Sequence, residues 1–206
     1  MTSKSQLAIK LSKLKVFENP KVRLEQYPTD SEIAADILWN MHMNNEIKDK
    51  VIVDAGCGTG ILGIGCLLLG AKRVIFIEID ENAVEILHEN LKSEGLTDLN
   101  SYKIIIDDIK NIDFKADITI QNPPFGVQNK HADKIFLEKA IKNSKIAYSM
   151  HKSETKGFVE AVCKENNAKI TQEFKFSFPL KQVYKHHKKR IERINVSCFR
   201  ITQKPF

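Results

Sequence analysis

The stretch that decides the fold is Val51-Ile52-Val53-Asp54-Ala55-Gly56-Cys57-Gly58-Thr59-Gly60. Its first five residues have the length and apolar composition of a buried strand. The three glycines predict a sharp turn, and the apolar residues that continue to Leu69 predict a helix. A strand, a glycine-rich turn and a helix in this order are typical of the first unit of an α/β fold that binds a nucleotide at the turn.

The alternation of short apolar runs and helical segments continues along the chain. A second apolar run at 74–79 is followed by a helix that begins at about Asp80. Five more strands are predicted, at residues 103–106, 118–121, 146–149, 169–178 and 195–202. This pattern predicts a mostly parallel seven-stranded sheet with helices on both faces. No long helix separates the last two strands, so we expect them to form an antiparallel C-terminal hairpin.

Two helical segments precede the first strand. Three leucines recur there at helical spacing: Leu7, Leu11 and Leu14. The residues Thr29-Asp30-Ser31-Glu32 have the form of a capping box, which predicts that Thr29 is the N-cap of a second helix. We expect one domain over residues 1–206, with an N-terminal helical extension at 1–45 and an α/β core at 46–206.

Composition limits the class of protein. The 206 residues, 42% of them hydrophobic, are enough for one sizeable core, and the net charge of +6 permits a nucleic-acid substrate. Four cysteines without any C-x-x-C pair suggest neither a metal site nor a disulfide framework. We expect a soluble, cytoplasmic protein, because no apolar stretch approaches the roughly 20 residues that span a bilayer and the start lacks the apolar core of a signal peptide.

The glycine-rich turn is the candidate cofactor site. Its spacing differs from the dinucleotide fingerprint, and Asp54 would repel a pyrophosphate, which argues against NAD. A carboxylate suits S-adenosylmethionine, which carries an ammonium and a sulfonium. A side chain at Gly56 or Gly58 should obstruct the ligand, and Glu78 at the end of the next strand can accept both ribose hydroxyls. The alternative is that Asp54 only caps the helix and Glu78 is solvated.

A third contribution to the cofactor site is expected after the next strand, at Asp107-Asp108-Ile109. Asp108 could hold the amino group of an adenine, and Ile109 could cover its ring. The alternative is that the paired acids are solvated loop residues, as they usually are at a strand end.

The turn Asn122-Pro123-Pro124-Phe125 is the candidate catalytic site, because it follows a strand at the carboxyl edge of the sheet. The prolines lock the backbone, so the nearby carbonyls point in set directions. If the Asn122 side-chain oxygen and the Pro123 carbonyl each accept one N–H of an exocyclic amine, the nitrogen lone pair can aim at a methyl donor. Phe125 would stack on a flipped base. The alternative is an ordinary turn with Phe125 in the core.

These motifs together resemble the methyltransferase-like protein five family, the adenine-N6 methyltransferases of small-subunit ribosomal RNA. The stretches that carry the resemblance are 24–29, 54–60, 122–126, 148–152 and 187–189. It implies a Rossmann-like class I methyltransferase that transfers a methyl group from S-adenosyl-L-methionine to N6 of an adenosine in structured RNA. Glu78 replaces the usual Asp of the family, and Thr59 stands where some members have Cys.

Carried over residue by residue, the family pattern places eight residues around the cofactor: Gln26, Thr29, Gly56, Thr59, Ile61, Glu78, Asp108 and Ile109. With the turn residues Asp54, Gly58 and Gly60 and the catalytic Asn122, they form the expected cofactor site. Gln26 and Thr29 bring the N-terminal extension into that site.

A basic run lies between the last two predicted strands. We expect phosphate contacts from this run and from the residues that follow the predicted strand 146–149, at Lys152, Lys185, Lys188, Lys189 and Arg190. The alternative is a solvated loop. His151 and Lys152 are weaker candidates, since a polar loop would explain them equally well.

The resemblance also implies a partner, a small zinc-binding methyltransferase activator. The strand near 102–106 is expected at a sheet edge, and its consecutive isoleucines would favour addition of a partner strand. Burial under helices is the alternative.

Two other functions are compatible with parts of the sequence. A protein glutamine N5-methyltransferase would use the same catalytic turn, and a non-catalytic RNA-binding ribosome assembly factor would keep the fold alone. The basic composition disfavours the first, and the intact Asp54, Glu78 and Asn122 disfavour the second.

Overall fold

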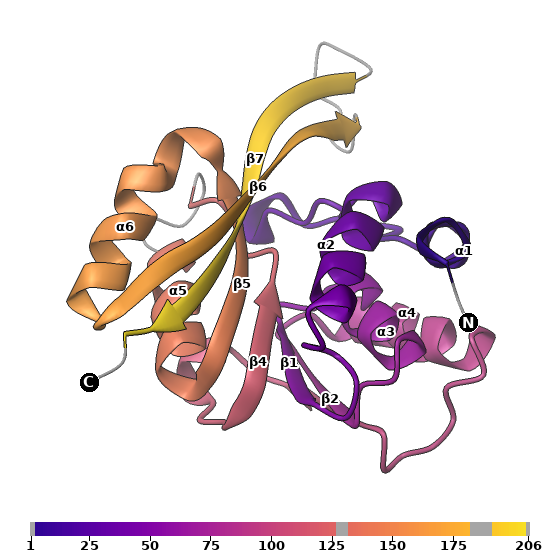
Figure 1. Ribbon diagram of the computed structural model, residues 1–206. Helices are drawn as coiled ribbons and strands as arrows, with labels where there is room; N and C mark the ends of the chain where they lie inside the picture. The colour runs from indigo at the N-terminus through magenta and orange to yellow at the C-terminus, as the bar shows by residue number, and fades with distance from the viewer. Residues whose placement is uncertain (1–2, 127–131, 182–190, 205–206) are drawn as a thin grey trace.

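The computed structural model describes residues 3–126, 132–181 and 191–204. Its strands are β1 (Val51–Ala55), β2 (Arg73–Glu78), β3 (Tyr102–Ile106), β4 (Ala116–Gln121), β5 (Ser144–Lys152), β6 (Ala168–Lys181) and β7 (Ile191–Gln203). They form one seven-stranded sheet in the order β3-β2-β1-β4-β5-β7-β6 (Figure 1). The first five strands along the chain pair in parallel, whereas β7 is antiparallel to both β5 and β6. The predicted fold class and the predicted C-terminal hairpin are therefore confirmed.

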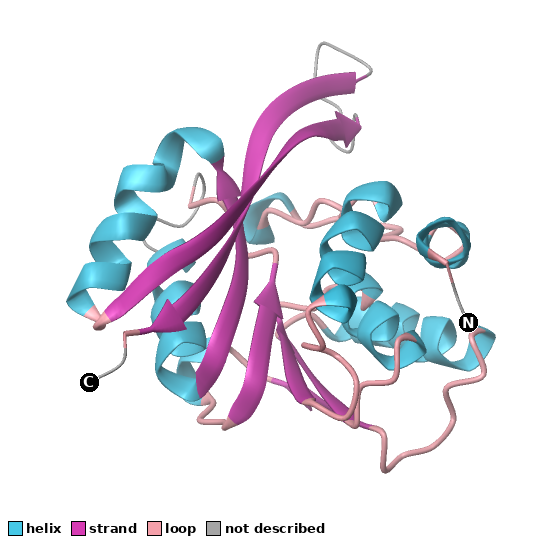
Figure 2. Ribbon diagram, in the orientation of Figure 1, coloured by secondary structure: helices cyan, strands magenta, loops and turns pink. Residues whose placement is uncertain are grey.

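Helices cover both faces of this sheet (Figure 2). On one face lie α1 (Lys4–Leu11), α2 (Ser31–Met43), α3 (Ile61–Leu68) and α4 (Glu81–Ser93). On the other lie α5 (Ala132–Asn143) and α6 (Lys156–Glu165). Because successive strand residues point to opposite faces, Ile52 packs in the core beneath α2 and α3, and its neighbour Val53 packs in a separate cluster on the other face.

The start of α2 differs from the prediction. The N-cap is Asp30, whose carboxylate accepts from the backbone N–H groups of Glu32 and Ile33, at 3.0 and 3.3 Å. Thr29 is therefore not the cap. Its hydroxyl instead accepts from the Asn122 side chain, 93 residues away, and a capping pattern in the sequence cannot reveal such a contact.

The start of α4 agrees with the prediction, since Asp80 is its N-cap and accepts from the backbone of Asn82 at 3.2 Å. All four cysteines are free and buried. Within the described ranges, the structure has no helix that is both long and apolar enough to cross a membrane. The division of the chain at residue 45 stays a prediction.

Candidate active site

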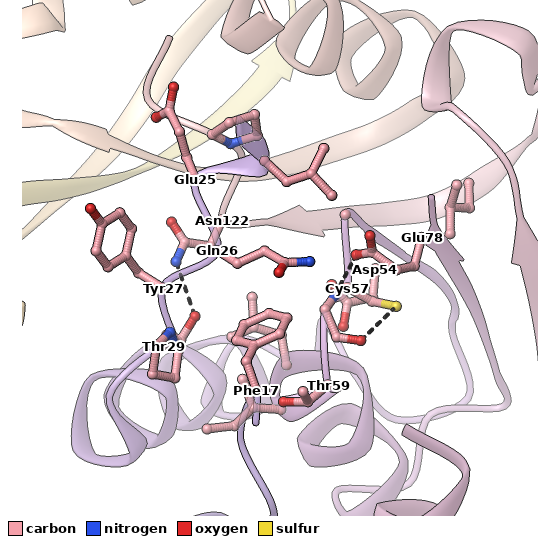
Figure 3. Close-up of a pocket in the computed structure, with 18 of the residues that line it drawn as sticks. Phe17, Glu25, Gln26, Tyr27, Thr29, Asp54, Cys57, Thr59, Glu78 and Asn122 are labelled. Carbon is pink, nitrogen blue, oxygen red and sulfur yellow. Dashed lines mark hydrogen bonds between the residues drawn. The ribbon is translucent and has the colours of Figure 1, made fainter. Parts of the chain in front are cut away.

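A cavity of about 640 Å³ lies at the carboxyl ends of β1, β2 and β4, the edge at which open α/β sheets bind ligands. Its walls are the glycine-rich turn, the end of β2, the start of the catalytic turn and residues 12–30, which we call the N-terminal strap (Figure 3). The strap connects α1 to α2 and contains a short 3-10 helix, Val22–Leu24. The volume is in the range of small-molecule sites.

The glycine-rich turn brings its residues to the cavity with one exception. Gly56, Gly58, Thr59 and Ile61 line it, as expected. A Cβ added to Gly58 would lie 2.7 Å from the ring of Phe17 in the strap, so the turn tolerates no side chain there. Gly60 is not among the residues that line the cavity, and its contact with the cofactor stays a prediction.

Packing explains why glycine is needed at position 60. Gly60 is the N-cap of α3 with φ +91°, and a Cβ there would overlap with the Leu87 side chain. Because glycine has no side chain, α3 can pack closely against α4 at this residue.

Asp54 has both the position expected of a cofactor-site residue and the helix-capping role that was given as the alternative. The carboxylate lines the cavity, and it also caps α3 by accepting from the backbone N–H of Gly63 at 2.7 Å. Burial raises the pKa of Asp54 to about 7. A carboxylate whose charge is so poorly solvated gains from a cation in the same cavity.

Glu78 is not solvated, so that alternative is wrong. It is buried, and its Oε1 accepts from the backbone N–H groups of Ile79 and Asp80, while Oε2 accepts from Gly58 at 2.8 Å. A carboxylate offers about four lone-pair sites, so these three bonds leave about one for a ligand. The structure therefore favours one ribose hydroxyl on Glu78, rather than two, unless a backbone bond is released.

Asp108 and Ile109 both line the cavity. Asp108 also caps a short 3-10 helix (Ile109–Asn111) and pairs with the Lys110 ammonium at 3.0 Å, so the loop role applies at least in part. Ile109 is buried in the apolar cluster of Val53 and Ile77. Its expected contact with a ring is compatible with this position.

The catalytic turn is held by its first side chain. Asn122 donates from Nδ2 to the Thr29 hydroxyl at 3.0 Å (Figure 3). Its Oδ1 is buried and finds no hydrogen-bond partner among the described residues. A buried acceptor without a donor is costly, and a ligand N–H would satisfy it.

The other turn residues differ in their placement. Pro124 lines the cavity, whereas Pro123 and Phe125 do not. Pro123 is buried, and the Phe125 side chain packs partly against the main core. Base stacking by Phe125 stays a prediction.

The N-terminal strap contributes more than the sequence indicated. Gln26 lines the cavity, but its side chain donates to Asp80 and accepts from the backbone of Lys21, both at 2.7 Å, so it fastens the strap to the end of β2. Other strap residues that were not predicted also line the cavity, and three of them are Phe17, Glu25 and Tyr27. Two of them lie in the family-like stretch 24–29, and that was the available signal.

Of the five residues predicted to contact phosphate, the structure describes only Lys152, and the contacts stay a prediction. Lys152 ends β5 with a partly exposed side chain 4.0 Å from Glu154. His151 is buried, and burial lowers its pKa to about 4, so a neutral ring faces the core and does not meet phosphate. The other four predicted residues lie outside the described residues: Lys185, Lys188, Lys189 and Arg190.

Comparison with known proteins identifies the enzyme class. Residues 29–172 match the family model of the methyltransferase small domain. The chain belongs to this family. Membership confirms the predicted methyltransferase class and, with it, S-adenosylmethionine as the cofactor. The buried carboxylates, the glycine turn and the unpartnered Asn122 oxygen fit that cofactor and an amine acceptor.

Comparison with individual relatives identifies a narrower family within the methyltransferases. It is 34% identical to the rRNA N(6)-adenosine-methyltransferase METTL5 of Danio rerio over 90% of this chain and 92% of the relative, so it also belongs to the family that the sequence resembled. An uncharacterized protein of Methanocaldococcus jannaschii is 40% identical over 100% of this chain and 97% of its own. A crystal structure from Pyrococcus horikoshii, named as a candidate RNA methyltransferase, has a TM-score of 0.88 and 42% identity, covering 98% of this chain and 99% of that chain.

Proposed function

We propose that the protein transfers a methyl group from S-adenosylmethionine to N6 of an adenosine in small-subunit ribosomal RNA. The observation that carries the proposal is the buried, unpartnered Oδ1 of Asn122 at the cofactor cavity. An exocyclic amine is the kind of group that would complete it. The METTL5 relatives, which match over most of both chains, support ribosomal RNA and adenosine as the acceptor.

The residues of the turn would activate the amine by orientation. The cofactor supplies an electrophilic methyl group when bound. The Asn122 oxygen and the Pro123 carbonyl would each accept one N–H of the amine, which makes the conjugated nitrogen more pyramidal and directs its lone pair into the cavity. Thr29 holds the Asn122 amide by accepting from Nδ2, which leaves the oxygen as the free acceptor of this side chain.

Transfer of radiolabelled methyl groups tests this proposal against its alternatives. The protein is incubated with labelled cofactor and with separated small-subunit RNA, large-subunit RNA and ribosomal protein. We expect label in the small-subunit RNA. Label in the protein fraction would favour the glutamine methyltransferase, and no transfer to any fraction would favour an assembly factor without turnover.

Removing the basic run should weaken RNA binding and its salt dependence. Replacing Lys188, Lys189 and Arg190 by Ala removes three charges, and we expect the slope of log affinity against log salt to fall by roughly 2–3. A filter-binding titration measures the slope.

The chain offers a control with the same charge loss. Lys48, Lys72 and Arg73 are exposed at the amino ends of β1 and β2, away from the cavity, so their replacement should change the slope less. Equal slopes for the two triple variants would contradict a specific role for 188–190.

We further propose that β3 accepts a strand from a small zinc-binding activator. β3 lies at the sheet edge, and apolar side chains remain exposed around it, with Ile106 at 50% and Leu99 at 73%. Exposed edges of this kind favour strand addition. The identity of the partner rests on the family resemblance alone.

Co-expression with such an activator should raise the recovered activity. Ile106→Asp should abolish co-elution of the two proteins on size exclusion, whereas Ile9→Asp should not, because Ile9 is equally exposed (56%) but lies on α1. A protein that is monodisperse and fully active alone would contradict the need for the activator.

A further inference from the structure

The strap contacts the catalytic turn at two points. Besides the Thr29 contact with Asn122, the Glu25 carboxylate accepts from the backbone N–H of Phe125, with Oε2 and N 2.7 Å apart. The two contacts lie at the two ends of the Asn-Pro-Pro-Phe sequence. A segment that precedes the sheet in sequence therefore holds a turn about a hundred residues later.

The composition of the turn explains why this particular N–H matters. Pro123 and Pro124 have no backbone N–H, so Phe125 carries the first amide donor after Asn122. A turn of this kind has few backbone donors by which the rest of the protein can fix it. A carboxylate is a strong acceptor for the remaining one, because the bond is charge-assisted.

The backbone at Glu25 is a second, independent indication. Glu25 has φ 52° and ψ 41°, a left-handed conformation that glycine adopts with least strain. The residue nevertheless carries a long acidic side chain. A strained non-glycine residue beside an active site is typical of a side chain that the site uses.

The neighbouring residues set the position of the Glu25 carboxylate. Asp80, at the end of β2, accepts from the Lys21 ammonium at 2.6 Å and from the Gln26 side chain at 2.7 Å. The strap is thus fastened to the cofactor side of the cavity immediately beside Glu25. Figure 3 shows the Gln26 and Glu25 side chains leaving the strap in different directions.

We infer that Glu25 is a positioning residue of the methyl-transfer reaction. Its carboxylate holds the Phe125 backbone, and this fixes the turn and the direction in which it presents the Pro123 carbonyl to the amine. Glu25 acts through Phe125 and not on the reacting atoms. The inference deepens the proposed function, on which it rests for its substrate.

Two substitutions separate this role from a merely structural one. Glu25→Gly removes the carboxylate and relieves the left-handed strain, so a structural role predicts an active protein that is at least as stable. We expect kcat to fall on the order of 10²-fold, as for a misplaced catalytic group, with a much smaller change in the KM for S-adenosylmethionine. Glu25→Gln keeps an acceptor oxygen, so we expect kcat within about 10-fold of the wild type.

The control and a second readout complete the experiment. Asp49→Gly changes another acidic residue with positive φ (61°), which is exposed and lies away from the cavity, and should leave kcat unchanged. Amide hydrogen exchange of Phe125 needs no substrate, and the amide should be protected in the wild type and Glu25→Gln but exchange faster in Glu25→Gly.

Each outcome decides a separate point. Unchanged exchange at Phe125 in Glu25→Gly would overturn the contact, and faster exchange with unchanged kcat would overturn its role in positioning. A wild type that does not methylate ribosomal RNA would overturn the proposed substrate, and the exchange measurement would still decide the contact.

Discussion

Replacing Asn122 by Ala is expected to lower the rate of methyl transfer on the order of 10²–10³-fold, the usual cost of losing one preorganised hydrogen-bonding group. The side chain supplies the buried oxygen that has no hydrogen-bond partner among the described residues. Cofactor affinity should change far less, because the carboxylates and the glycine turn lie on the other wall of the cavity. Single-turnover kinetics and calorimetric titration with S-adenosylmethionine measure the two quantities.

Two further variants test whether the loss of rate is specific to Asn122 and to the orientation of its amide. Thr29→Val keeps the size of the side chain but removes the acceptor for Asn122 Nδ2, so we expect a smaller loss of rate through a less well oriented amide. Asn44→Ala alters an exposed asparagine after α2 and should have no effect. Equal rates for wild type and Asn122→Ala would remove Asn122 from the mechanism.

Replacing Asp54 by Asn should stabilise the ligand-free protein at neutral pH and weaken cofactor binding. Burial raises the pKa of Asp54 from an ordinary value of 3.8 to about 7, and each pH unit corresponds to about 1.4 kcal/mol. The charged carboxylate therefore costs the fold up to about 4 kcal/mol above pH 7. The macrodipole of α3 favours that charge by only about 0.3–1 kcal/mol, so the desolvation dominates.

The sign of the pH dependence follows from the raised pKa. The folded protein binds more protons than the unfolded chain between pH 4 and 7, so the contribution of Asp54 to stability is complete below about pH 4 and is lost as the pH rises to 7. Asn keeps an oxygen that can cap Gly63 but carries no charge, so the gain from Asp54→Asn should grow over that interval. Thermal unfolding at a series of pH values measures it.

The same substitution should reduce affinity for S-adenosylmethionine about 10-fold, the order expected for charges that interact across a water molecule. Asp117→Asn is the matched control with the opposite sign, because a hydrogen bond from Lys145 lowers the pKa of that carboxyl, and the amide should destabilise the protein. If Asp54→Asn is less stable than the wild type at pH 8 without ligand, the desolvation argument fails.

The sheet and the glycine turn were predictable because the information for them is local. The run at 51–55 is apolar in a strand-length window, and the carboxyl edge of a parallel sheet gathers the residues that follow each strand. Asp54, Glu78 and Asn122 accordingly meet at one cavity, as expected.

The N-terminal strap was less predictable because its contacts are not local. It has no periodic pattern over most of its length, so the sequence could not show that Phe17, Glu25 and Tyr27 line the cavity. The capping pattern at 29–32 contains three side chains that can cap, and the local sequence shows neither that Asp30 is the cap nor that Thr29 contacts Asn122. The packing role of Gly60 was unpredictable for a similar reason, since its neighbour Leu87 belongs to another helix.

Nucleoside analysis of the reacted RNA tests the proposed reaction most directly. Small-subunit ribosomal RNA that lacks the modification is incubated with wild type or Asn122→Ala, digested to nucleosides and analysed by mass spectrometry. We expect N6-methyladenosine to form with the wild type and to be nearly absent with the variant. Methylation of another nucleoside, or equal amounts of N6-methyladenosine from the two proteins, would contradict the proposed function.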